Sequence, residues 1–395
     1  MLGLGPRVRG TCAAVCLTVV LAACGGSSGT TGQSKQPFKI GSIWSLTGAA
    51  AAANVIGYHE TQMIVDDINS NGGLNGRRID VTYEDDQSNP SQGVTAAKLL
   101  INNVGVHVIV GPGYTPVALS VSSIAESSNT VLFTPGSIAP QLTNPLQKYI
   151  FAANPTTAVV GPDVINLMTS MGFHNPGMIA ESDSFGDLAV QATTNALSAK
   201  GLKIGSQASI GATAIDATAQ VAKMQADGVD VVVGGVDTLG AMTAVLKAMY
   251  QQKVTFPYIS FVIFGGIDQV LAQYPVEAYA ATPTACPLTS SCAASFVSEY
   301  QARYPSDSSI LPAAGLEYAA MQAFFQALKQ AKSDSADDVV QALETAPAYS
   351  NSLLPGPFQW TATSHLGSHL VAFEGFKAGK LYFFGNVINQ NHLGS

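Results

Sequence analysis

Short runs rich in β-branched residues alternate with longer amphipathic stretches from Lys39 onward, and this alternation restricts the fold more than any other feature. The first series predicts strands at 39–44, 79–84, 107–110 and 131–134, with helices at 52–70, 90–104 and 115–127. The second series predicts strands at 177–181, 203–209, 229–234 and 258–261, with helices at 156–171, 185–200, 215–227 and 239–251. Alternating strands and helices pack as parallel sheets with crossover helices. The sequence therefore predicts an α/β protein with two doubly wound parallel-sheet lobes.

The last hundred residues add three helical stretches, at 293–304, 313–331 and 336–346, and then short strands around 358–360, 369–376 and 380–384. Two doubly wound lobes in one chain imply a cleft between them. In open α/β sheets, ligands bind beyond the carboxyl ends of the strands. Functional residues are therefore expected in the loops that directly follow the strands.

The N-terminus has the features of an export signal. Arg7 and Arg9 precede an apolar stretch at 11–23 that is too short to span a bilayer. It ends in the letters LAAC, which resemble the lipobox of bacterial lipoproteins, so Cys24 is the expected lipidation site. Residues 1–23 are then the signal peptide, and 24–37 form a flexible Gly/Ser-rich tether. An ordinary secretory peptide is the alternative.

The five cysteines divide according to this interpretation. Cys12 and Cys16 leave with the signal and Cys24 carries lipid, so Cys286 and Cys292 remain. In an oxidising extracytoplasmic setting, two cysteines six residues apart predict a disulfide loop. A metal pair is disfavoured because no further Cys or His lies near them in sequence.

Charge and motifs exclude several classes of function. Eighteen Lys and Arg residues against 26 Asp and Glu residues give a net charge of −8, and the longest basic run is Arg77-Arg78, so nucleic acid is not an expected partner. The letters GGSSG at 25–29 match a nucleophile elbow, but they lie in the tether with no strand before them. No metalloprotease, phosphate-loop or dinucleotide-binding pattern is present. The chain is predicted to be no enzyme and to use no cofactor or metal.

Several segments in fixed order carry a resemblance to a known family. They are DINSNGGLNGR at 67–77, EDDQSNP at 84–90, VGP at 110–112, TPGS at 134–137, DSFG at 183–186 and GPFQW at 356–360. In order and spacing they resemble the leucine/isoleucine/valine-binding protein family, the extracytoplasmic substrate-binding proteins of branched-chain amino-acid-type ABC importers. The resemblance implies a type I periplasmic-binding-protein fold, in which two lobes joined by a three-stranded hinge close on a ligand. Lobe one would comprise 38–156 and 283–368, and lobe two 157–282 and 369–395.

The resemblance also implies a set of ligand contacts on lobe one. Family members that bind amino acids hold the ligand carboxylate at the position of Thr115, which follows Tyr114 at a helix start where N–H groups favour an anion. In the next loop Gly136 and Ser137 fit the family pattern, but Ile138 stands where the family has a threonine.

On lobe two the family's ligand-packing aromatic corresponds to Phe185. The acid that would pair with a ligand ammonium falls near Phe261, where no carboxylate is present. Asp237, directly after Val236, is the candidate substitute, and its alternative role is to cap the following helix.

Large aromatic residues follow several of the predicted strands, namely Trp44, Tyr114, Phe185, Phe261 and Phe264. If they face the cleft, they favour a hydrophobic or aromatic ligand with one anionic group; the alternative is that they fill the lobe cores. The predicted function is that of a monomeric lipoprotein, anchored to the cell membrane or its periplasmic face, that delivers an amino acid or small organic acid to ABC permease subunits. A ligand-sensing module of the same fold is the alternative.

Overall fold

The computed structural model describes residues 36–262, 266–284, 286, 291–307, 315–377 and 380–383. All of them belong to one compact unit. The predicted signal peptide, Cys24, most of the tether and Phe264 lie outside the described residues.

The first sheet has the order β2-β1-β3-β4-β5, and all neighbouring strands in it are parallel. Its strands are β1 (Phe38–Trp44), β2 (Ile79–Asp85), β3 (Val108–Val110), β4 (Val131–Thr134) and β5 (Ile150–Ala152). The helices around it are α1 (Ala51–Ser70), α2 (Pro90–Leu99), α3 (Thr115–Ser127), α9 (Ala294–Arg303), α10 (Gly315–Leu328) and α11 (Ala336–Thr345).

Helices cover both faces of this sheet. Successive strand residues point to opposite sides, so an apolar strand places side chains in both of the cores that these helices form. Val131 and Phe133 belong to the core under α1 and α10, where the ring of Phe133 stacks on Phe324 at a centroid distance of 4.4 Å. Leu132, between them, packs instead into the core under α2 and α3. The continuous apolar strands that the sequence shows are therefore buried on both faces.

The second sheet has the order β12-β11-β10-β9-β8-β6-β7. Its strands are β6 (Pro176–Glu181), β7 (Ser206–Ile210), β8 (Val231–Gly235), β9 (Tyr258–Ser260), β10 (Ala278–Thr282), β11 (Ala372–Lys377) and β12 (Lys380–Phe383). β6 to β10 pair in parallel, whereas β11 pairs antiparallel with both β10 and β12. The helices are α4 (Thr157–Ser170), α5 (Ser184–Ser198), α6 (Thr218–Ala226), α7 (Leu239–Gln251) and α8 (Ile267–Gln273). The two doubly wound parallel-sheet lobes predicted from the sequence are thus present.

The element predictions fail at short segments. β5, β10 and α8 were not predicted, and the strand expected at 358–360 is only an isolated bridge between Tyr349 and Phe358. Residues 100–104, expected to continue a long α-helix, form a π-helical turn, η1 (Leu100–Val104). β10 has the alanine-rich sequence AYAAT, and its strand conformation follows from pairing with β9 and β11 rather than from local propensity.

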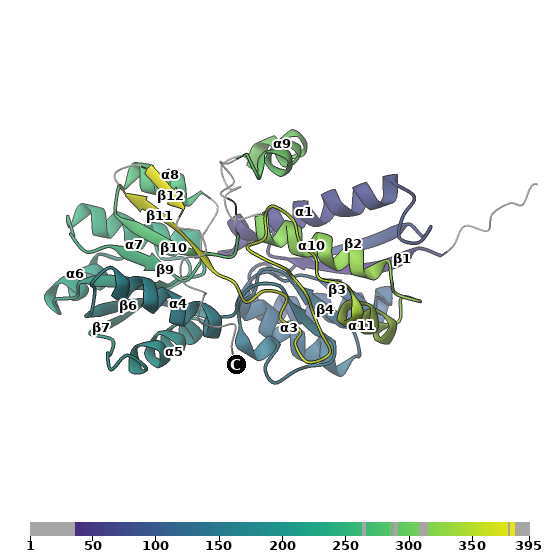
Figure 1. Ribbon diagram of the computed structural model, residues 1–395, viewed down its shortest axis with the longest axis horizontal. Helices are drawn as coiled ribbons and strands as arrows, with labels where there is room; N and C mark the ends of the chain where they lie inside the picture. The colour runs from purple at the N-terminus through teal and green to yellow at the C-terminus, as the bar shows by residue number, and fades with distance from the viewer. Residues whose placement is uncertain are drawn as a thin grey trace, which may run out of the picture. The chain divides into compact units, whose positions relative to one another are not determined.

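The described chain passes between the two sheets three times (Figure 1). The passages follow β5, follow β10, and precede β11, where Leu366 still bridges to Ala152 of the first sheet. Three separate chain segments therefore connect the lobes. Within the described residues, no helix has both the length and the hydrophobicity required to cross a bilayer.

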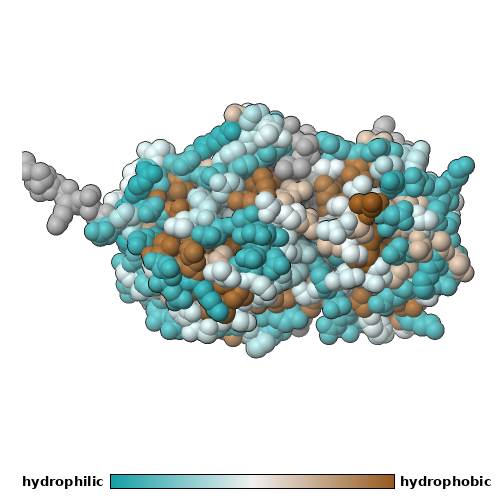
Figure 2. All heavy atoms as spheres, turned by 180° about the vertical axis from the view of Figure 1, so that it is seen from behind, coloured by the Kyte–Doolittle hydropathy of each residue, from teal (hydrophilic) through white to brown (hydrophobic). Residues whose placement is uncertain are grey.

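Most of the large apolar side chains are used in the lobe cores. Of those whose side chains are described, the exposed ones are Leu99, Leu146, Ile215 and Tyr250. The face in Figure 2 shows hydrophobic atoms in separate groups between hydrophilic ones. Scattered exposed apolar residues of this kind are ordinary for a globular surface.

Candidate ligand-binding site

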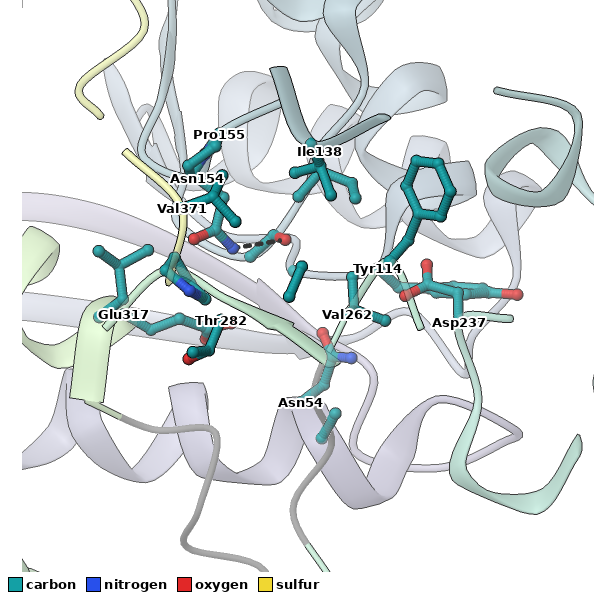
Figure 3. Close-up of a pocket in the computed structure, with 18 of the residues that line it drawn as sticks. Asn54, Tyr114, Ile138, Asn154, Pro155, Asp237, Val262, Thr282, Glu317 and Val371 are labelled. Carbon is teal, nitrogen blue, oxygen red and sulfur yellow. Dashed lines mark hydrogen bonds between the residues drawn. The ribbon is translucent and has the colours of Figure 1, made fainter. Parts of the chain in front are cut away.

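A cavity of about 90 Å³ lies where residues of both lobes meet. The loops after β3 and β4 contribute Tyr114 and Gly136, and the loops after β8 and β9 contribute Asp237 and Phe261. All four loops follow the carboxyl ends of parallel strands, which is where open α/β sheets bind ligands. Val371, on the third passage between the lobes, also lines the cavity. Figure 3 shows Tyr114 and Asp237 on one side of this pocket and Asn154 and Glu317 on the other.

The structure places half of the ten predicted ligand contacts in the lining of this cavity. Its lining includes Tyr114, Gly136, Ile138, Asp237 and Phe261. The remaining three loop residues, Thr115, Ser137 and Val236, are buried directly beside them in sequence. The loop positions that the sequence singled out therefore converge.

Two predicted aromatic contacts are corrected. Trp44 is buried in the core of the first lobe, where its Nε1 donates to Ser42 Oγ at 2.9 Å and its ring packs against Gly57. Phe185, in the first turn of α5, is buried in the core of the second lobe. Neither ring lines the cavity, because a residue at a strand end can point toward either the cleft or the core, and large aromatic rings gain most from full burial.

The start of α3, the predicted anion site, faces a carboxyl group of the protein itself. Thr115 is the first residue of α3, and Ser137 Oγ donates to its Oγ1 at 3.4 Å. Burial, together with the negative charges of Asp183 and Glu181, raises the pKa of Asp237 well above its usual range, while hydrogen bonding from Thr115 lowers it. Asp237 thus directs a carboxyl group at the helix N-terminus, where an anion is favoured.

One hydrogen bond crosses from lobe to lobe beside this group. Tyr114 Oη donates to Asp183 Oδ2 at 2.9 Å, and the other oxygen of Asp183 accepts from the Gly186 N–H at the start of α5. Glu181 accepts from the Asp237 N–H at 2.9 Å, and burial and the charge of Asp183 raise the pKa of Glu181 to about 7. The carboxyl ends of β6 and β8 in the second sheet therefore carry several acidic groups.

Several lining residues were not identified from the sequence, and three of them bring amide or carboxyl groups to the cavity. Asn54 lies on α1, Asn154 follows β5, and Glu317 is in the first turn of α10. Burial raises the pKa of Glu317 to about 7. The signal that could have identified Glu317 is a single acid in the otherwise apolar start of α10. The approach of α1 to α10 is a property of the tertiary structure.

Glycines let these groups come together. A Cβ on Gly136 would lie 2.8 Å from Glu317 Oε1 and 2.9 Å from the Cα of Gly113, and a Cβ on Gly57 would lie 3.0 Å from Glu317 Oε2. A Cβ on Gly113 would lie 2.7 Å from Asn54 Oδ1. Any side chain at these positions would fill the space that the carboxyl and amide groups occupy.

The part of the chain that the structure describes contains no group of three or more His, Cys, Asp or Glu residues arranged to hold a metal ion. The sulfur atoms of Cys286 and Cys292 are bonded to each other, with their Cα atoms 6.1 Å apart.

Comparison with known proteins decides the family. Residues 37–380 match the family model described as periplasmic binding protein. The chain belongs to the periplasmic binding protein family. Its members are extracytoplasmic substrate-binding proteins and not an enzyme family, and the type I fold inferred from the sequence is confirmed.

Individual relatives of this binding protein are distant. Leu/Ile/Val-binding protein homolog 8 of Brucella abortus (strain 2308) is 25% identical over 336 residues, which cover 78% of this chain and 79% of that protein. The structure of a fatty acid ABC transporter substrate-binding protein from Thermomonospora curvata has a TM-score of 0.77 at 19% identity and covers 90% of this chain and 93% of that one. A substrate-binding protein from Desulfitobacterium hafniense in complex with Leu has a TM-score of 0.70 at 18% identity, covering 88% and 100%. At these identities the two structures show the shared fold.

Proposed function

We propose that this protein is the extracytoplasmic substrate-binding component of an ABC importer of the branched-chain amino-acid type. It captures a small molecule between its lobes and passes it to permease subunits of the membrane. The observation that carries this proposal is the cavity lined from both lobes at the carboxyl ends of the strands. The names of the relatives, which include Leu/Ile/Val binding and an ABC transporter, support it.

Closure of the lobes on the ligand accounts for capture. Lobe one comprises 38–156 and 283–368, lobe two comprises 157–282 and 369–395, and the three passages between the sheets act as hinges. The hydrogen bond between Tyr114 and Asp183 supports closure, because it joins the two lobes at the edge of the cavity. The proposed ligand contacts are Tyr114, Thr115, Gly136, Ser137, Ile138, Val236, Asp237 and Phe261.

The ligand is a small amino acid or a hydrophobic organic acid. The leucine complex of the Desulfitobacterium relative supports the first class, and the fatty acid transport role named for the Thermomonospora protein supports the second. The apolar residues Ile138, Phe261 and Val371 in the lining suit an apolar ligand body in either case.

Export and anchoring complete the proposal. Cleavage before Cys24 and lipidation of that cysteine hold the protein at the membrane, and the arginines at 7 and 9 with the apolar stretch that follows support this. The Cys286–Cys292 disulfide forms in the oxidising compartment, and the Cα separation of 6.1 Å suits such a bond.

The test is to incubate the purified protein with a pooled set of amino acids, carboxylic acids and amines. Native mass spectrometry should show one ligand per chain, small-angle X-ray scattering should show a smaller radius of gyration with ligand, and the ligand should be recovered unchanged. A chemically altered ligand would show an enzyme instead. Failure of every compound to bind, with an unchanged radius, would contradict the binding function.

A further inference from the structure

The buried polar atoms that line the cavity without a partner are all hydrogen-bond acceptors. They are Asn54 Oδ1, Asn154 Oδ1 and Asp237 Oδ2, each without a partner among the described residues. Both asparagine side chains are more than nine-tenths buried. Buried acceptors are costly when unpaired, and a ligand that supplies N–H groups would satisfy them.

The orientation of both amide groups is fixed by the protein. Asn54 Nδ2 donates to the Ala50 carbonyl at 3.0 Å, and Asn154 Nδ2 donates to the Gly136 carbonyl at 3.0 Å. A carbonyl oxygen only accepts, so turning either amide group around would set two oxygens against each other. The amide oxygens, not the NH2 groups, therefore remain available to a ligand.

Glu317 adds a carboxyl group to the same part of the cavity. Its two oxygens lie against Gly136 and Gly57, and it has no hydrogen-bond or ion-pair partner in the described part of the chain. Glu60, the neighbouring acid on α1, is buried with neither oxygen paired to a described residue. The cavity lining contains no Lys, Arg or His, so none of its side chains supplies the positive charge that these carboxyl groups lack.

The end of the cavity near α3 is poorly suited to a ligand carboxylate. Asp237 already faces Thr115 at the start of that helix, with Asp183 and Glu181 close by. A carboxylate placed there would meet like charges. An ammonium group would meet a carboxyl group at either end of the pocket. Glu317 lies on one side and Asp237 on the other (Figure 3).

We propose that the cavity binds an organic ammonium ion with an apolar body, and that the ligand needs no carboxylate. The N–H groups of the ammonium donate to Glu317 and to the amide oxygens of Asn54 and Asn154. Asp237, on the second lobe, adds a further carboxyl group to the lining of the cavity. Ile56, Ile138, Val160, Phe261 and Val371 surround the apolar body. This inference rests on the proposed binding function. Of the two ligand classes named there it excludes the organic acids, and it extends the ammonium-bearing class to amines without a carboxylate.

Three compounds of nearly the same shape test it by isothermal titration calorimetry of the purified protein at neutral pH. Leucine has both charged groups, isoamylamine is leucine without its carboxylate, and isocaproate is leucine without its ammonium. Isoamylamine should bind at least about tenfold more tightly than isocaproate and no more weakly than leucine. Tighter binding of isocaproate, or binding of leucine alone, would overturn the proposal and leave the binding function in place. Failure of these and of the pooled compounds would overturn both.

A matched pair of variants locates the ammonium site. Glu317→Gln keeps the size of the side chain and removes its charge, so it should weaken isoamylamine binding at least about tenfold. Glu84→Gln makes the same chemical change on β2, outside the cavity, and should leave the affinity unchanged. Circular dichroism confirms that each variant is folded. Equal affinity of wild type and the folded Glu317→Gln variant would overturn the assignment.

Discussion

The Glu317→Gln variant should be more stable than the wild type at high pH and equally stable at low pH. Burial raises the pKa of Glu317 in the folded protein to about 7 from an ordinary value of 4.5. The folded state therefore binds the proton more tightly than the unfolded state does. The stability that this proton provides is complete below pH 4.5 and is lost as the pH rises through about 7.

The magnitude follows from that interval. At about 1.4 kcal/mol per pH unit, the rise from 4.5 to about 7 corresponds to about 3 kcal/mol in the free energy of unfolding. Glu317 is only partly buried and lines the cavity, so screening by solvent reduces the expected effect to about 2 kcal/mol. A glutamine has the same shape and does not ionise, so the free energy of unfolding of the variant does not fall in this way as the pH rises.

Urea unfolding followed by circular dichroism measures the effect on ligand-free protein, at about pH 4.5 and about pH 8 and at constant ionic strength. The variant should gain about 2 kcal/mol over the wild type at the higher pH only. Glu84→Gln, outside the cavity, should differ from the wild type by less than about 0.5 kcal/mol at both values. A difference between variant and wild type that is the same at both pH values would refute the reasoning.

Tyr114→Phe removes the hydroxyl group that joins the lobes at Asp183, and it should weaken ligand binding about fivefold, the effect of losing one hydrogen bond of about 1 kcal/mol; an unchanged calorimetric affinity would contradict this link. Gly57→Ala should lower the free energy of unfolding by about 1–3 kcal/mol, because the new Cβ would lie 2.3 Å from Trp44 Cζ3; a wild-type urea midpoint would argue against this packing. Affinity for isoamylamine should fall about tenfold per pH unit below about pH 7 as Glu317 takes up a proton beside Glu60; a flat calorimetric profile would count against an ionised partner.

The longer elements of this fold were predictable because their signals are local. β4, α3 and α7 begin and end at the residues expected from the hydrophobic pattern and from the turn residues beside them. The short segments were not predictable in the same way. β5 has three residues and the alanine-rich β10 has five, so pairing with neighbouring strands, rather than propensity, determines their conformation.

For the candidate site, too, the sequence predicted the positions of residues in the chain but not the directions of their side chains. Loop positions after predicted strands identified Tyr114, Gly136 and Asp237, because the carboxyl ends of parallel strands meet at one edge of a sheet. The direction of a side chain at a strand end depends on packing with distant elements. That is why the rings of Trp44 and Phe185 lie in the cores rather than in the cavity.

The sequence by itself determined the two α/β series, the family, and the loops that form the pocket, since each depends on residues close together in the chain or on motifs in fixed order. Only the tertiary structure decided the polarity of the pocket. Asn54 and Glu317 are 263 positions apart, and their meeting depends on α10 packing beside α1 while close glycines leave room for both groups. Burial keeps water from the side-chain oxygens of these two residues and leaves them to a ligand. No local pattern in the sequence specifies that burial.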